Sequence, residues 1–157
     1  MKYVKHDGGR AAAGFKGEAG DCVARSLAIV TGLPYAEVHY ALACGTGTQR
    51  RSSRTGKRGF TAERGINTGR KWFKDYMASL GFHWTPTMGI GQGCKVHLRD
   101  GELPMGRLLV SVSKHSTAVV DGVIYDTHNP DRGGNRCVYG YWSKTLNPEI
   151  AFSGVSE

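Results

Sequence analysis

The spacing of apolar residues in the first half of the chain predicts helices, and the most apolar of them covers residues 22–31. Its buried stripe recurs every third or fourth residue and is widened by small and branched neighbours: Val23, Leu27, Val30, Ala24, Ala28 and Ile29. Arg25 is its one charged residue, so the helix is expected at the centre of the fold rather than on the surface. Asp21 is the predicted N-cap, and Gly32 marks the predicted end.

Two further helices are predicted between residues 34 and 80. The first begins at Pro34, which suits the first turn of a helix, and ends at Gly45. Its apolar face contains Tyr35, Val38 and Leu42. The second begins at Asn67 or Thr68 and ends at Leu80, with an apolar set of Trp72, Phe73, Tyr76, Met77 and Leu80.

From about residue 95 the pattern changes to that of β-strands. Three runs have strand character, namely residues 95–98, 108–113 and 136–142. Residues 116–127 form two β-rich runs around Asp121-Gly122, a strong hairpin signal. Helices followed by an antiparallel sheet predict an α+β fold, and neither a repeat nor a linker divides the chain, so residues 1–157 are expected to form a single domain.

The remaining segments are predicted to be irregular, and one of them is strongly basic. Residues 1–20 and 85–94 have no apolar period, and residues 46–59 combine five basic residues with no acidic or apolar one. This basic loop is predicted to be mobile, and its cations are Arg50, Arg51, Arg54, Lys57 and Arg58. The whole chain has a formal net charge of +8. Together with this charge, the basic loop favours weak, nonspecific contact with nucleic-acid phosphates.

The four cysteines are expected to be reduced thiols of a cytoplasmic protein. No signal-peptide pattern opens the chain, and no apolar run reaches the length of a membrane span, so no membrane association is expected. Cys44, Cys94 and Cys137 are interpreted as core or loop thiols. Cys94-x-x-His97 has no second close pair of ligands, so neither a metal nor another cofactor is predicted.

Cys22 is a candidate nucleophile because it opens the apolar helix, where the helix dipole favours a thiolate. Of six histidines, His115 precedes a strand of the predicted hairpin. If Val120 pairs with Val123, the open end of the hairpin brings either Asp126 or Asn129 near His115, which supplies a base and an orienting group. The alternatives stay open: Cys22 as a small buried residue, His115 as a strand-end residue and Asp126 as a turn former.

These residues resemble those of a known family. A cysteine at a helix start, followed by a sheet that bears His and then Asp, resembles the papain-like fold, and is similar to the bacteriocin-processing peptidases and their phage relatives. The matching residues are Asp21-Cys22, His115 and Asp126 within YDTHNP. GDCVARSLAIVTG, MGIGQGCKVHL and HSTAVVDGVIYDTHNP also resemble small, mostly uncharacterised proteins of phages and prophages.

The resemblance implies a cysteine-dependent peptidase or amidase with a Cys22, His115 and Asp126 triad, acting on a peptide or protein in a host cytoplasm or virion. Papain-like enzymes usually carry an oxyanion-binding Gln about six residues before the cysteine, where this chain has Lys16. Lys16 and the remote Gln92 are the substitute donors considered. The alternative is a non-enzymatic papain-like protein that binds nucleic acid or a host protein through its basic loop. The sequence predicts neither the bond cleaved nor the oligomeric state.

Overall fold

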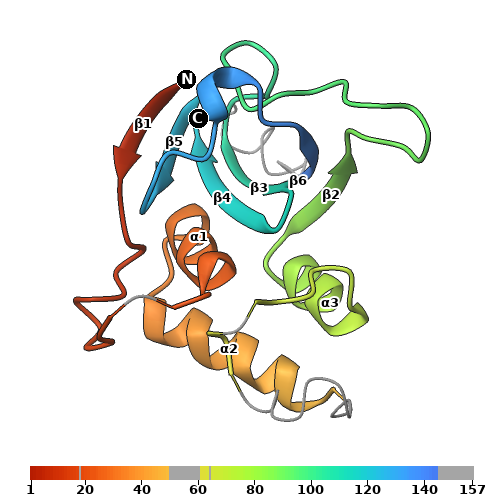
Figure 1. Cartoon of the computed structure of the whole chain (residues 1–157). Helices are drawn as coiled ribbons and strands as arrows, with labels where there is room; N and C mark the ends of the chain where they lie inside the picture. The colour runs from red at the N-terminus through yellow and green to blue at the C-terminus, as the bar shows by residue number, and fades with distance from the viewer. Residues whose placement is uncertain (18, 50–60, 64, 145–157) are drawn as a thin grey trace, which may run out of the picture.

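The structure is a computed structural model that describes residues 1–17, 19–49, 61–63 and 65–144. The described residues form three α-helices, one short 3-10 helix and a six-stranded mixed sheet, an α+β fold as predicted. In chain order the elements are β1 (Lys2–Lys5), α1 (Cys22–Thr31), α2 (Tyr35–Gly47), α3 (Lys71–Ser79), β2 (Phe82–Pro86), β3 (Arg107–Val112), β4 (His115–Val120), β5 (Val123–Asp126), η1 (Arg132–Gly134) and β6 (Val138–Lys144). Figure 1 shows α1, α2 and α3 gathered on one side of the sheet.

The strands lie in the order β1-β5-β4-β3-β6-β2. The central pairs are antiparallel, including the predicted hairpin of β4 and β5. The prediction of a wholly antiparallel sheet is wrong, because β1 pairs in parallel with β5. This strand also lies within the N-terminal segment that was predicted to be irregular, so the chain begins as an edge strand (Figure 1).

The predicted helices are present, with shifted ends in two of them. Helix α1 has the predicted bounds and ends at Gly32, whose φ of 73° is a left-handed conformation that favours glycine. Helix α2 continues two residues beyond Gly45. Helix α3 starts later than predicted, because the Asn67 side chain accepts a hydrogen bond from the Gly69 N–H at 3.0 Å and forms a local turn there.

The sheet is buried on both faces. On the helix side, Leu109, Ala118 and Trp142 pack against the helices, with Leu27 of α1 fully buried among them. On the other face Leu108, Val110, Val119 and Ile124 form a second cluster, covered by the segment around Leu98. Alternate residues of β3 and β4 therefore serve opposite cores. Strands β3 and β4 are packed on both faces, so side chains at their ends are attached to a well-ordered backbone.

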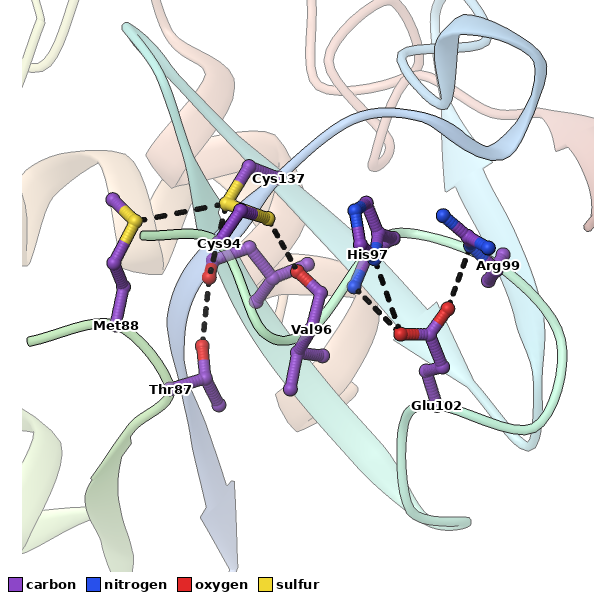
Figure 2. The surroundings of a disulfide bond; sticks show 9 residues. Thr87, Met88, Cys94, Val96, His97, Arg99, Glu102 and Cys137 are labelled. Carbon is purple, nitrogen blue, oxygen red and sulfur yellow. Dashed lines mark hydrogen bonds and ion pairs between the residues drawn. A yellow bond between two sulfur atoms is a disulfide. The ribbon is translucent and has the colours of Figure 1, made fainter. Parts of the chain in front are cut away.

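The segment that follows β2 is tied to the start of β6 by a disulfide. Cys94 and Cys137 are bonded, with Cα atoms 5.8 Å apart, and Met88 Sδ lies 3.7 Å from Cys137 Sγ (Figure 2). The expectation that these two cysteines are free thiols is wrong, because the fold brings together residues that are 43 positions apart. The predicted strand at 95–98 is reduced to a single bridge between His97 and Cys137, and β2 extends into the segment 85–94 that was predicted to be irregular.

The structure does not describe most of the basic loop. The cations of the basic loop, Arg50, Arg51, Arg54, Lys57 and Arg58, lie outside the described residues. Within the described residues, no helix has both the length and the apolar character needed to cross a membrane.

Candidate active site

Cys22 is the first residue of α1, and the residue before it holds a buried ionic cluster. Asp21 is fully buried and accepts hydrogen bonds from Arg10 at 3.0 Å, from Arg25 at 2.9 Å and from the hydroxyl of Tyr35. Its carboxylate makes no side-chain cap to the helix, so its position was predicted correctly but its capping role was not. The first-turn N–H groups next to Cys22 are therefore left for another acceptor.

Helix α1 is docked on β4 by polar contacts near the thiol. The Ser26 hydroxyl donates a hydrogen bond to the Ser116 carbonyl at 3.1 Å, and both residues are buried. Cys22, His115 and Ser116 line the same cleft, and His115 and the Ser116 N–H lie close enough to the thiol to lower its pKa. The contact between helix and strand thus sets the sulfur beside the start of β4.

The β4–β5 hairpin places His115 next to Asp126. The register pairs Val120 with Val123, as the sequence predicted, across a turn in which Asp121 and Gly122 both have positive φ. His115 Nε2 lies 2.6 Å from Asp126 Oδ2. Because Nε2 is engaged by the carboxylate, Nδ1 is the ring nitrogen left for the Cys22 thiol. The structure therefore brings three predicted residues, Cys22, His115 and Asp126, into one chain of contacts.

Asp126 is held in place by its neighbours and by the N-terminal strand. Its Oδ1 accepts a hydrogen bond from the Thr127 N–H at 2.7 Å. Its backbone carbonyl accepts from the Tyr3 hydroxyl at 3.2 Å and from the His6 N–H at 2.8 Å. Strand β1 therefore braces the residue that orients His115, a role that the sequence did not indicate.

The electrostatics of the three groups favour a thiolate–imidazolium pair. Burial alone would raise the pKa of the Cys22 thiol, but the bonds from His115 and the Ser116 N–H, with the positive charges of His115 and Arg25, lower that pKa below its ordinary value. Burial alone would lower the pKa of His115, but its bonds to Asp126 and Cys22 raise that pKa to about 9. Burial alone would raise the pKa of Asp126, but its hydrogen bonds to His115 and to the Thr127 N–H, together with the positive charge of His115, lower that pKa below its ordinary value.

The Cys22–His115 pair lies in an open cleft of about 340 Å³. The cleft is lined by Cys22, Val23, Gly65, Ile66, Asn67, Thr68, Ser111, Val112, Lys114, His115, Ser116 and Tyr139. Two of the lining residues have polar groups without a partner among the described residues: the Ser111 hydroxyl, which is buried, and the exposed Lys114 ammonium group. Among the described residues that line the cleft, none is acidic.

Three other predicted site residues do not reach this cleft. Lys16 is exposed, and its backbone carbonyl accepts a hydrogen bond from Arg10 at 3.1 Å. Gln92 lines a separate hollow and accepts from Lys95 at 3.2 Å. Asn129 accepts from the Asp131 N–H at 3.1 Å, which closes a local turn. Asp126 and not Asn129 is therefore the partner of His115, and neither Lys16 nor Gln92 is placed as an oxyanion donor.

The cleft also contains residues that the sequence did not indicate. Residues 65–68 form one wall, and the Gly65 N–H donates to the Gly20 carbonyl at 3.0 Å, which fixes this wall beside the start of α1. Tyr139 reaches the cleft next to an irregularity in the β3–β6 pairing at Ser111 and Val112. A bulge re-aims side chains at such a point. No local sequence pattern signals either contact, because both depend on pairing between distant segments.

Metal ligands are not grouped in the part of the chain that the structure describes. Among those residues, no cluster of three or more His, Cys, Asp or Glu side chains is placed to hold a metal ion. The one sequence pair with metal-like spacing is used otherwise, since Cys94 is in the disulfide and His97 contacts Glu102 at 3.2 Å (Figure 2).

Comparisons of this chain with protein-family models, with curated proteins and with solved structures found no significant match.

Proposed function

We propose that this chain is a cysteine-dependent hydrolase of peptide or amide bonds. One observation carries the proposal: the Cys22 thiol at a helix start and His115 line the same open cleft, and His115 Nε2 lies 2.6 Å from a buried Asp126. Nucleophile, base and orienting group in this order are what acyl transfer through a thioester needs.

In the first half of the reaction, the Cys22 thiolate attacks the carbonyl carbon of the substrate and forms a carbon–sulfur bond. The developing oxyanion is stabilised by N–H groups of the first turn of α1, which Asp21 leaves uncapped. The His115 imidazolium donates its proton to the leaving amine as the carbon–nitrogen bond breaks. A thioester and a neutral imidazole remain.

In the second half, neutral His115 accepts a proton from water as the water oxygen attacks the thioester carbon. The carbon–sulfur bond breaks, the acid product leaves, and the Cys22 thiolate and His115 imidazolium are restored. Asp126 stabilises the imidazolium throughout and fixes the ring orientation through its contact with Nε2.

The proposal extends to fold type, partners and compartment. A papain-like arrangement fits a cysteine at the start of the central helix with His and Asp on a following sheet. The partner is a peptide or protein substrate, with weak nucleic-acid contact through the basic loop as a secondary role. Because the nucleophile must be a free thiol, the proposed compartment is the cytoplasm of a host cell, or the virion, if the protein is phage-encoded. The Cys94–Cys137 disulfide argues against a reducing compartment, since such bonds are rare in the cytosol, so the redox state of this pair in the cell decides the assignment.

The test is the rate at which iodoacetamide alkylates Cys22, followed by mass spectrometry of its peptide. Cys44 is the internal standard, since it is also free and is more exposed than Cys22. Cys22 should react faster than Cys44. The ratio of the two alkylation rates should increase at pH 6, where an ordinary thiol is less than about 1% ionised. His115→Ala should slow Cys22, while His97→Ala, at a histidine with a different carboxylate partner, should not.

Turnover is tested with p-nitrophenyl acetate, a small activated ester that needs no specific recognition. Cys22→Ala should abolish hydrolysis above background, and Asp126→Asn should lower it without unfolding the protein. Equal labelling of Cys22 and Cys44, or an unchanged rate of Cys22 alkylation in His115→Ala, would contradict the enzyme proposal. Nucleic-acid binding that weakens with salt and is unchanged by alkylation of Cys22 would then favour the alternative, a non-enzymatic binding protein.

A further inference from the structure

Lys114 lies at the mouth of the cleft, directly before His115. It is the second residue of the two-residue turn between β3 and β4, which begins after Val112 and ends before His115. The residue is exposed and belongs to the cleft lining. A cation is therefore carried on the same rigid hairpin as the imidazole.

The backbone at Lys114 is in a conformation that lysine rarely adopts. Its φ is 56°, in the left-handed region where a hairpin turn favours Gly or Asn. The turn is held from outside, because Arg136 donates a hydrogen bond to the Ser113 carbonyl at 2.5 Å. A side chain kept in a strained position at a site is an observation that points to function.

The charge of Lys114 is not used within the described fold. It has no ion-pair partner among the described residues, whereas exposed Lys71 pairs with Asp75 at 2.7 Å. The cleft wall near it carries the His115 imidazole, and none of the described lining residues is acidic. Among the described residues that line the cleft, the Cys22 thiolate is therefore the one anion, and it is paired with the His115 imidazolium, so the Lys114 charge is left for a ligand.

We propose that Lys114 selects substrates that carry a carboxylate close to the bond to be cleaved. The inference rests on the proposed function, because it takes Cys22 as the reacting atom of the same cleft. A carboxylate at the mouth of the cleft would pair with the Lys114 ammonium group. Lys114 is a specificity residue in this scheme and takes no part in proton transfer.

The experiment compares the alkylation of Cys22 by iodoacetate, which is an anion, and by iodoacetamide, which is neutral and of nearly the same size. The readout is the ratio of the two rate constants, measured at low salt with Cys44 as internal reference. The imidazolium also attracts the anion, so the decisive quantity is the change made by Lys114→Gln. We expect this variant to lower the Cys22 ratio by about threefold to tenfold.

Two variants serve as controls. Lys114→Arg keeps the charge and should keep the ratio near that of the wild type. Lys74→Gln removes an exposed lysine on α3, outside the cleft, and should leave the ratio unchanged. Added salt should bring the wild-type ratio toward that of Lys114→Gln, because exposed charges are screened.

The carboxylate has two sources, an acidic side chain and a chain terminus, and protection of Cys22 from iodoacetamide separates them. Acetyl-Ala-Glu-Ala-amide carries only a side-chain carboxylate, acetyl-Ala-Ala-Ala only a terminal one, and acetyl-Ala-Ala-Ala-amide neither. If one of the two carboxylate peptides protects Cys22 better than the neutral peptide does, and this difference disappears in Lys114→Gln, that peptide identifies the source of the carboxylate. If neither protects better than the neutral peptide, the carboxylate assignment is overturned.

The outcomes separate this inference from the proposal beneath it. If Cys22 is no more reactive than Cys44 with iodoacetamide, the proposed function fails, and the substrate inference falls with it. If Cys22 is reactive but Lys114→Gln leaves the ratio of the two reagents unchanged, the enzyme proposal stands and the role of Lys114 is rejected.

Discussion

The proton on His115 is held by two neighbours against the effect of burial. The bonds to Asp126 and Cys22 raise the pKa of His115 to about 9 from an ordinary value of 6.5. Since the folded-state pKa is the higher one, the stability linked to this proton is fully present below about pH 6.5 and is lost as the pH rises through about 9. The charged form of His115 is therefore the working form at neutral pH.

This dependence gives a prediction for Asp126→Asn. The substitution removes the anion that faces Nε2, so the pKa of His115 should fall toward its ordinary value, and the loss of linked stability should move to lower pH. An NMR titration of the imidazole measures the change directly. Glu102→Gln is the matched control, because Glu102 contacts His97 and should leave the His115 titration unchanged.

The strained backbone at Lys114 gives a second prediction. Asn tolerates a positive φ better than Lys, so Lys114→Asn should be as stable as the wild type or more stable, by up to about 1 kcal/mol. Lys74→Asn, the same substitution within α3, should instead lower the free energy of unfolding by about 0.5 kcal/mol, since Asn is a poor helix former. Urea denaturation compares them. A clear loss of stability in Lys114→Asn would show that the turn does not strain lysine.

The sequence identifies site residues whose positions follow from local rules. Cys22 follows from an apolar helix with a polar start, and the partnership of His115 with Asp126 follows from counting outward from Asp121-Gly122. No such rule applies to residues 65–68, because this wall of the cleft is placed by the hydrogen bond from the Gly65 N–H to the Gly20 carbonyl. Tyr139 likewise depends on an irregularity in strand pairing that no local pattern marks.

Among the elements, helix α1 depends most on contacts that its own sequence does not contain. Its first turn is fixed by Asp21, which joins α1 to Arg10 of the N-terminal segment and to Tyr35 of α2. The buried carboxylate accepts a hydrogen bond from each of two guanidinium groups, and Glu63 supplies a second anion to Arg10 at 3.2 Å. Cys22 is therefore positioned by three segments at once.

Asp21→Ala should destabilise the protein by about 3 kcal/mol, because Arg25 would lose its carboxylate partner and buried Arg10 would keep only the half-exposed Glu63. The measurement is the free energy of unfolding in urea. Asp75→Ala removes the exposed pair with Lys71 and should cost less than about 0.5 kcal/mol. A similar loss in both variants would contradict the structural role of the cluster.

The elements missed by the sequence are the edge strands. Strand β1 is short and mostly exposed, with Lys at both ends, so it lacks the alternation that marks a half-buried strand. Strand β2 has only Phe82 buried and ends in Pro86, which is tolerated at a sheet edge. Central strands β3 and β4 were predicted because they are buried on both faces, whereas edge strands are defined by their neighbours.

At the scale of the whole molecule, the Cys94–Cys137 disulfide links the segment after β2 to β6 across 43 positions. Its pairing was not predictable from spacing, because any two of four cysteines satisfy the count. The bond also adjoins the cleft, since Cys137 lies two residues before Tyr139 and the Thr87 N–H donates to the Tyr139 carbonyl at 3.0 Å. Closing this bond therefore stabilises the start of β6, which carries Tyr139 in the wall of the cleft.

Closing a loop of this length should stabilise the folded state by about 4 kcal/mol through the lost entropy of the unfolded chain. Reduction with dithiothreitol, or the double substitution Cys94→Ser and Cys137→Ser, should then lower Tm by about 10 °C. Cys44→Ser should leave Tm unchanged and keep its sensitivity to dithiothreitol, whereas the double variant should lose that sensitivity. A wild-type Tm that is indifferent to reductant would show that the bridge does not hold the fold together. Because Cys22 must be reduced to react, alkylation of Cys22 in the double variant then tests whether the cleft keeps its reactivity without the bridge.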